Sequence, residues 1–307
     1  MQMRGAAGQG TLLIVGCGYV GTRLARRLRG EGPLLGLVRR RAAADALLGQ
    51  GIPALAADLE YEAAAVSLGL PTTLRAVAYL VPPSGPGAED RCLARFLEAI
   101  EDAAPGVFLY VSTTGVYGDT GGAAVDEESP VAPREDRSRQ RLDAEQQIAH
   151  WCEVRDLRAV TVRVPAIYGP HRLPLDRLRR GEPVLREEDS GPGNRIHVDD
   201  LVEACAAALE RPVAGPFNLT DGTPESMTAF NRRVAALAGL PWPPEVTWTE
   251  AEGLISPGLL AFLRESRLVA TRRREELGWS PRYVNPDDGI RASLAEMGWT
   301  TDLNSKR

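Results

Sequence analysis

The chain has 307 residues, of which 44% are hydrophobic and 25% are charged, a composition typical of a folded protein with about two domains. The net charge of −5 argues against a general nucleic-acid-binding surface, and no apolar run is long enough to cross a membrane. The four cysteines form no CxxC pair, which argues against a disulfide framework and against a thiolate metal site. Because the first residues are also too poor in apolar side chains for a signal peptide, we expect a cytoplasmic protein.

The first half of the chain alternates short apolar runs with segments of helix length. Strands are predicted at residues 11–15, 33–38, 52–57, 75–81, 106–112 and 158–164. Helices are predicted between them at residues 19–29, 42–49, 60–68, 88–103 and 137–154. Strands that are apolar on both faces, each followed by a helix, predict an α/β fold of the Rossmann type with a doubly wound parallel sheet.

From about Pro165 this alternation gives way to loops rich in proline and glycine. We interpret residues 11–164 as the Rossmann domain, and residues 165–194 and 223–307 as a smaller substrate-side domain. The chain is expected to re-enter the sheet near residues 217–220, so that residues 195–222 complete it.

The motif GCGYVG, residues 16–21, directly follows the first predicted strand and opens the first helix. This is the setting in which GxGxxG binds the diphosphate of a dinucleotide. Gly16 permits the tight turn, Gly18 lets the backbone approach the diphosphate, and Gly21 lets helix and strand pack closely. The alternative is a glycine-rich turn without a ligand. The residues expected to contact the coenzyme here are Gly16, Gly18, Tyr19, Val20 and Gly21.

Three arginines, Arg39 to Arg41, follow the second predicted strand, where an NAD-binding protein carries an acidic residue for the ribose 2′-hydroxyl. A guanidinium can hold a 2′-phosphate through paired hydrogen bonds, so Arg39 and Arg40 predict NADP(H) rather than NAD(H). Alternatively, these arginines only solvate the start of a helix. The pair Asp58 and Leu59 after the third strand is placed to reach the adenine, although Asp58 could equally cap the next helix.

Five segments follow one another in a characteristic order. They are GCGYVG at 16–21, YVSTTGVYG at 110–118, RVPAIYGPHR at 163–172, NRIHVDDL at 194–201 and FNLTDG at 217–222. Together they resemble the NAD(P)-dependent epimerase/dehydratase group of the extended short-chain dehydrogenases/reductases. The resemblance implies that substrate binds between the carboxyl edge of the sheet and the small domain. It also implies coenzyme contacts at Val81, Pro82, Ser112 and Pro165.

The catalytic residues of this family are a serine or threonine and a Tyr-x-x-x-Lys pair on one helix face, where the lysine lowers the pKa of the phenol. Thr113 stands at the hydroxyl position and could hold a substrate carbonyl or hydroxyl, or it could instead tie down a loop. The Tyr–Lys pair is absent, because Lys306 is the only lysine in the chain. The family register places Arg137 at the tyrosine position and Arg141 at the lysine position. Arg141 could bind the nicotinamide ribose, whereas Arg137 cannot act as an acid or base near neutral pH.

Two further departures from the family pattern bear on the substrate. Nucleotide-sugar enzymes of the family often have asparagine at the position of Ala166 and arginine at the position of Gly193, whereas here the arginine is Arg195. Both changes weaken the prediction of a nucleotide-sugar ligand. The pattern is closer to the atypical subgroup that keeps the coenzyme loop and lacks the tyrosine.

Two other pairs of residues have both a structural and a chemical interpretation. His197 and Asp199 in RIHVDDL are expected to cap the helix that follows rather than to catalyse. Tyr117 and Tyr168 each lie in a tight YG turn and are expected to pack structurally, although either could supply a phenol to the cleft. The candidate catalytic residues are therefore Thr113, Tyr117 and Arg141.

Functions from different classes fit these features. The favoured one is an NADP-dependent oxidoreductase, epimerase or dehydratase that acts on a small carbonyl, sugar or nucleotide-sugar substrate with an atypical proton donor. The alternatives are a non-catalytic NADP(H)-binding protein that senses redox state or supports a partner, and a structural module with a vestigial glycine loop. The apolar stripes at residues 88–103 and 137–154 could form a homodimer, as in relatives, or could pack on the sheet.

Overall fold

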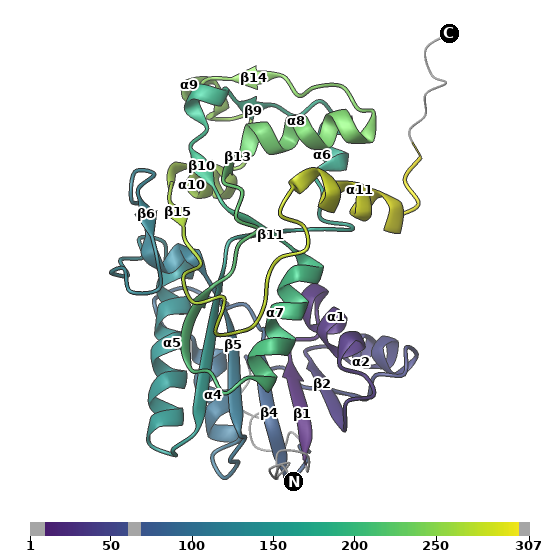
Figure 1. The fold of residues 1–307 in the computed structure, drawn as a ribbon, viewed down its shortest axis with the longest axis vertical. Helices are drawn as coiled ribbons and strands as arrows, with labels where there is room; N and C mark the ends of the chain where they lie inside the picture. Colours follow the sequence, from purple (N-terminus) through teal and green to yellow (C-terminus); the bar gives the residue numbers. More distant parts are fainter. Residues whose placement is uncertain (1–9, 61–68, 301–307) are drawn as a thin grey trace.

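The computed structural model describes residues 10–60 and 69–300, and its centre is a parallel sheet (Figure 1). The sheet has seven strands in the order β12-β7-β5-β4-β1-β2-β3. In chain order these are β1 (Thr11–Val15), β2 (Leu34–Val38), β3 (Ala54–Ala56), β4 (Leu74–Tyr79), β5 (Val107–Thr113), β7 (Arg158–Val164) and β12 (Gly215–Asn218). The predicted doubly wound α/β fold is confirmed. Because the strand order reverses between β1 and β4, a crevice is expected at the carboxyl ends of these two strands.

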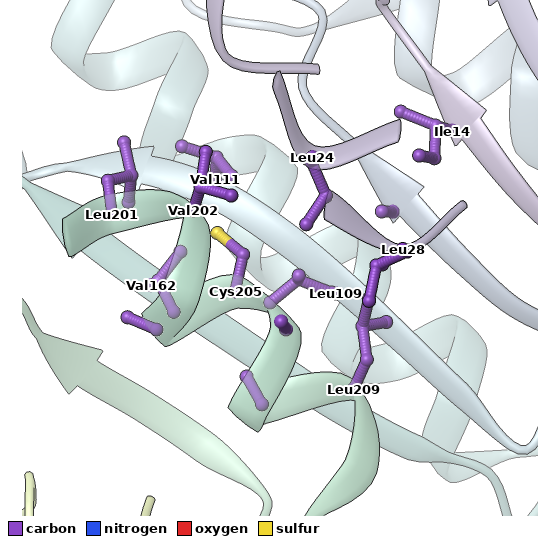
Figure 2. Close-up of a cluster of buried hydrophobic side chains, with 14 of the residues drawn as sticks. Ile14, Leu24, Leu28, Leu109, Val111, Val162, Leu201, Val202, Cys205 and Leu209 are labelled. Atoms are coloured by element: carbon purple, nitrogen blue, oxygen red, sulfur yellow. The ribbon is translucent and has the colours of Figure 1, made fainter. Parts of the chain in front are cut away.

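Helices cover both faces of the sheet because successive strand residues point to opposite sides. Leu12 and Ile14 belong to the core under α1 (Tyr19–Arg27) and α7 (Val198–Glu210). In Figure 2, Leu24 and Leu28 lie on the side of α7 that carries Cys205 and Leu209, and all four belong to this core. Leu13 and Val15 belong to the opposite core under α4 (Arg91–Ala99) and α5 (Asp136–Glu153). The apolar stripes of α4 and α5 therefore pack on the sheet, and a homodimer stays a prediction.

The predicted elements agree with the structure closely at the centre of the sheet and less well at its edge. The strands at 11–15 and 158–164 have the predicted bounds, and α2 (Arg41–Leu48) begins one residue before its prediction. β3 is shorter than predicted because Pro53 has no N–H to donate to the sheet. The helix predicted at 60–68 lies outside the described residues except for its first position.

A smaller group of elements lies beyond one end of the sheet (Figure 1). Its helices are α6 (Leu175–Arg179), α8 (Met227–Ala238), α9 (Trp248–Ala251), α10 (Pro257–Arg264) and α11 (Pro286–Glu296). Its short strand pairs are β8 (Ala166–Tyr168) with β11 (Arg195–His197), β9 (Val184–Leu185) with β14 (Glu245–Val246), and β10 (Pro192–Gly193) with β13 (Glu225–Ser226). The pair β6 (Ala124–Val125) with β15 (Leu268–Val269) lies beside them. We refer to this group as the upper lobe.

The C-terminal part of the chain does not stay in the upper lobe. The sequence placed all of 223–307 in the substrate-side domain, but Leu277 and Trp279 are buried in the core between the sheet and α7. The chain then returns to the upper lobe, where Ile290 and Leu294 of α11 pack with Phe230 of α8. No helix within residues 10–60 and 69–300 has both the length and the apolar character that a membrane crossing needs.

Candidate active site

The glycine motif forms a tight turn between β1 and α1. Gly16 has φ of +92°, a conformation that side chains other than glycine disfavour, and its N–H donates to the Leu37 carbonyl at 2.9 Å. A Cβ atom on Gly21 would overlap the Gly16 carbonyl oxygen, so only glycine permits this contact. A Cβ atom on Gly18 would meet nothing within 4 Å. The three glycines therefore have three different physical roles, and Gly18 borders open space.

This turn fits the diphosphate of a dinucleotide. The first residues of α1 have no side-chain cap, so that their N–H groups are available to an anion at the positive end of the helix dipole. Val81 lies directly against the turn, because a Cβ atom on Gly16 would be 2.9 Å from its backbone nitrogen. The exposed Pro82 follows it, and Val20 is half-buried behind the turn. The open space thus lies at the crevice between β1 and β4.

The residues predicted to bind the adenosine half have different degrees of exposure. Arg39 and Arg40 are exposed where β2 meets α2, and Arg39 has a carboxylate of Glu60 at 3.8 Å. Both guanidinium groups are therefore accessible to a ligand. Asp58 accepts a hydrogen bond from the Glu60 N–H at 3.0 Å, as a residue that caps a helix would. The Leu59 side chain is buried in the core beside α4, so that only its backbone could reach a coenzyme.

A cleft of about 560 Å³ opens between the carboxyl edge of the sheet and the upper lobe. Thr113 at the end of β5 and Pro165 after β7 line it, together with residues of α5 and α10. The Thr113 hydroxyl accepts a hydrogen bond from the Gly115 N–H at 3.1 Å and so ties down the turn, as one interpretation predicted. Its own proton has no acceptor among the described residues, which leaves it free to donate to a ligand in the cleft.

Arg172 connects this cleft to the glycine turn. It lines the cleft, and its guanidinium carbon lies 4.4 Å from the centre of the Tyr19 ring. The Tyr19 hydroxyl in turn donates to the Pro170 carbonyl at 2.8 Å. The cleft lining therefore contacts the helix that the glycine turn opens, through the packing of Arg172 on Tyr19. Arg172 stands in the segment at 163–172 but was not predicted as a site residue.

A family model described as the NAD dependent epimerase/dehydratase family matches residues 12–219. The chain belongs to this family. Among curated relatives, a 3-diazoavenalumate denitrifying reductase from a Streptomyces species is 29% identical over 147 residues, which is 44% of this chain and 47% of the relative. A UDP-glucose 4-epimerase from Mycolicibacterium smegmatis is 27% identical over 203 residues, 62% of each chain. The matches thus span about half to three fifths of these relatives.

Solved structures agree over nearly the whole chain. A functionally unknown conserved protein from Silicibacter pomeroyi has a TM-score of 0.79 and 31% identity, covering 94% of this chain and 99% of that one. A dTDP-glucose 4,6-dehydratase from Bacillus anthracis in complex with NAD has a TM-score of 0.73 and 14% identity, covering 97% and 98%. The second likeness shows the fold alone. The resemblance to the epimerase/dehydratase family is thus confirmed, and this is a family of enzymes.

Arg137 and Arg141, which the predicted register places at the family's tyrosine and lysine positions, both lie on α5 and line the cleft. Arg141 is anchored by one nitrogen, Nη1, which donates to the Val111 carbonyl at 2.7 Å and to the Tyr110 hydroxyl at 3.2 Å. Arg137 is exposed and forms no ion pair with a described carboxylate. No tyrosine, histidine or lysine is among the described residues that line this cleft.

Tyr117 does not supply the missing phenol, which corrects the prediction that made it a candidate. Its side chain is buried, and its hydroxyl donates to Asn218 Oδ1 at 2.9 Å and accepts from Arg163 Nη1 at 3.0 Å. Burial raises the pKa of Tyr117, against the opposing effect of Arg163. Tyr168 is equally buried, between the rings of His197 and Phe230. Both tyrosines pack structurally, as the other interpretation predicted.

A buried ion pair that was not predicted from the sequence lies beneath the cleft. Arg163 Nη2 of β7 and Glu145 Oε2 of α5 are 2.7 Å apart, and both side chains are less than a tenth exposed. Ser112, predicted to contact the coenzyme, lines the cleft and donates its hydroxyl to Glu145 at 2.5 Å. The signal in the sequence was a charged residue, Arg163, between two valines near the end of the strand RAVTVRV. A buried guanidinium requires a buried partner.

His197 is structural, in agreement with the interpretation favoured from the sequence. It is the N-cap of α7, where its Nδ1 accepts from the Asp199 N–H at 3.2 Å, while its Nε2 lies 3.1 Å from the Ser293 hydroxyl. Asp199 does not cap the helix itself but pairs with Arg23 at 3.1 Å. Burial lowers the pKa of His197 well below 6.5, although the nearby Asp199 opposes this shift. The imidazole is therefore neutral at neutral pH.

This shift predicts a pH-dependent stability. Because the native pKa is the lower one, the unfolded chain binds a proton at His197 first as the pH falls below 6.5. The free energy of unfolding should then decrease by up to about 1.4 kcal/mol per pH unit. In His197→Asn, whose amide oxygen can still cap α7, urea unfolding between pH 7 and pH 5 should show a smaller decrease. An unchanged pH dependence would argue against this assignment.

Proposed function

We propose that the protein is an NADP(H)-dependent oxidoreductase of the epimerase/dehydratase family that acts on a small carbonyl or sugar substrate. One observation carries the proposal: the Thr113 hydroxyl proton is free in a cleft at the carboxyl edge of the sheet, and Arg172 of the cleft lining packs on Tyr19 of the glycine motif. A reductase, an epimerase and a dehydratase among the matching relatives support a reaction of this class.

When bound, the nicotinamide would supply or accept the hydride. The chain's own groups would act on the substrate oxygen. Thr113 can donate a hydrogen bond to that oxygen, and the permanently charged guanidinium of Arg141 can stabilise negative charge that develops on it. Neither a threonine hydroxyl nor a guanidinium serves as a general acid under neutral conditions, so we infer that the proton comes from water. The family's Tyr–Lys mechanism is thereby replaced by a threonine, an arginine and solvent.

The preference for NADP(H) over NAD(H) rests on Arg39 and Arg40. Both are exposed at the end of β2, and the residue that directly follows this strand, where an NAD-binding protein carries a carboxylate for the ribose 2′-hydroxyl, is Arg39. Arg41, by contrast, pairs with Asp45 on its own helix at 3.0 Å. We propose that Arg39 and Arg40 contact the 2′-phosphate and that Arg41 does not.

The proposal predicts a specific effect of Thr113→Ala on turnover. In assays of NADPH oxidation with a panel of aldehydes and ketones, the wild-type protein should turn over at least one substrate. Thr113→Ala should lower kcat on that substrate about 100-fold, because a hydrogen bond made to the reacting oxygen is lost. Thr113→Ser, which keeps the hydroxyl, should retain most of the activity. Equal rates for the wild-type protein and Thr113→Ala would contradict the proposal.

A second candidate is a non-catalytic NADP(H)-binding protein. The observation that favours it is that the described lining of the cleft contains no tyrosine, histidine or lysine. This candidate predicts saturable NADPH binding together with no turnover of any carbonyl or sugar-nucleotide substrate. The Thr113 experiment therefore distinguishes the two functions.

A further inference from the structure

The two walls of the cleft differ in chemistry. One part of the lining, which we call the arginine-lined wall, contains the guanidinium groups of Arg137 and Arg141 from α5 and of Arg172, which follows β8. Another part, which we call the apolar wall, comes from α10 in the upper lobe (Figure 1) and includes Phe262, whose side chain is about half exposed. Apolar side chains left exposed in a concave site indicate a binding surface.

The apolar wall extends beyond Phe262. Ala261 and Leu263 of α10 and Met227 at the start of α8 also line the cleft, and all three are half-buried. A flat or branched apolar group placed against this wall would remove their remaining surface from water, which is favourable in proportion to the area buried.

The positive charge of the arginine-lined wall is not neutralised by carboxylates of the protein. Two further arginines line the cleft, but their donors are already used. Arg195 donates to the carbonyls of Glu225 and Ser226, and Arg267 donates to the Gly118 carbonyl and pairs with Glu265. Arg137, Arg141 and Arg172, which we call the arginine triad, form no ion pair with a carboxylate within residues 10–60 and 69–300.

One carboxylate, that of Glu135, also lines the cleft outside these pairs. Three guanidinium groups against one carboxylate leave the cleft with an excess of positive charge. A cleft with this excess attracts anions and raises their local concentration. Guanidinium groups bind carboxylates and phosphates through paired hydrogen bonds, so that the ligand's charged group is expected to be one of these two.

We propose that the substrate of this cleft is an amphipathic anion: an apolar body that packs against Phe262 and a carboxylate or phosphate that binds the arginine triad. This inference rests on the proposed function, because the coenzyme fills the part of the site next to the glycine turn. Such a substrate differs from a nucleotide sugar, because the sugar group is polar, whereas the side chains of α10 that line the cleft are apolar. Ala166, which also lines the cleft, offers no hydrogen bond to a nucleotide diphosphate.

The test is calorimetric titration of the full chain saturated with NADP+, so that no turnover occurs. The probes are cinnamate, phenyl phosphate, the neutral isostere cinnamyl alcohol, and UDP-glucose. At least one aromatic anion should bind, and both cinnamyl alcohol and UDP-glucose should bind at least about 10-fold more weakly than it. The tighter of the two anions identifies the charged group as carboxylate or phosphate. Equal affinity for the neutral isostere, tighter binding of UDP-glucose, or no binding of either anion would overturn the inference.

Matched variants locate the two contacts. Arg137→Gln and Phe262→Ser should each weaken anion binding about 10-fold. Arg139→Gln, an exposed arginine of α5 outside the cleft, and Val284→Ser, an exposed apolar residue outside it, should leave binding unchanged. If Arg137→Gln and Phe262→Ser bind the anion like the wild-type protein, the inference is wrong.

The affinity for NADP+ is measured separately for each variant. If the wild-type protein does not bind NADP+, the proposed function fails. If NADP+ binds and the anion preference is absent, only the present inference fails.

Discussion

Replacing Gly18 by aspartate should abolish NADPH binding while leaving the protein folded. A side chain at this position would enter open space, because a Cβ atom on Gly18 meets nothing within 4 Å. The new carboxylate would lie at the uncapped start of α1, where a negative charge stabilises a helix. The same charge would repel the coenzyme diphosphate at a cost of several kcal/mol, which lowers NADPH affinity more than about 100-fold.

Two control variants make this result specific. Gly18→Ala adds a methyl group without charge and should reduce NADPH affinity much less than Gly18→Asp. Gly21→Ala should instead disturb the turn itself, because its Cβ atom would overlap the Gly16 carbonyl oxygen, and should lower the unfolding temperature. Calorimetry measures the coenzyme affinity, and thermal unfolding reports the fold. NADPH binding by Gly18→Asp with wild-type affinity would show that the diphosphate lies elsewhere.

Removing the charge of Glu145 should produce the largest loss of stability among the single substitutions considered. In Glu145→Leu, Arg163 would keep its charge in the core with only the Tyr117 hydroxyl as a partner at 3.0 Å. An uncompensated buried charge costs about 3–5 kcal/mol. Ser112 would lose the acceptor of its hydroxyl as well. Urea unfolding at pH 7 should therefore show a free energy of unfolding lower by about this amount.

A double variant separates the unpaired charge from lost packing. In Glu145→Leu/Arg163→Met no charge remains buried, and a large part of the lost stability should return. As a surface control, Glu203→Gln removes the partner of Arg27 in an exposed ion pair and should cost less than about 1 kcal/mol. A cost below about 1 kcal/mol for Glu145→Leu would contradict the assignment of a buried pair.

The sheet could be predicted from the sequence because its strands are apolar on both faces and its turns contain glycine. Leu12 to Val15 are completely buried and all apolar, so the ends of this strand could be predicted from the sequence. The roles of Gly16, Gly18 and Gly21 followed from their spacing alone, since local geometry decides them. Local sequence patterns predicted β3 less accurately, because Pro53 shortens this strand. They also did not predict that Leu277 and Trp279 return to the core of the sheet.

The cleft could be predicted only in part. Thr113 and Arg141 were predicted as site residues from their positions in the family's motifs, and the structure places both in the cleft lining. Tyr117 belongs to the same motif, but its orientation depends on Asn218, a residue that is distant in the sequence. That Phe262 and Arg137 line the same cleft depends on how the upper lobe docks on the sheet. The spacing of residues within a single sequence segment cannot predict how the two parts of the structure dock.

We infer above all that the glycine turn, Arg39 and Arg40 bind NADP(H), and titration calorimetry with NADPH and NADH measures this binding. NADPH should bind the wild-type protein saturably and more tightly than NADH. Arg39→Ser/Arg40→Ser should reduce NADPH affinity about 10- to 100-fold and leave NADH affinity unchanged, since only charged hydrogen bonds to the 2′-phosphate are lost. Arg41→Gln, whose wild-type arginine pairs with Asp45, should behave like the wild-type protein. If neither coenzyme gives saturable heat with the folded wild-type protein, the claim is contradicted.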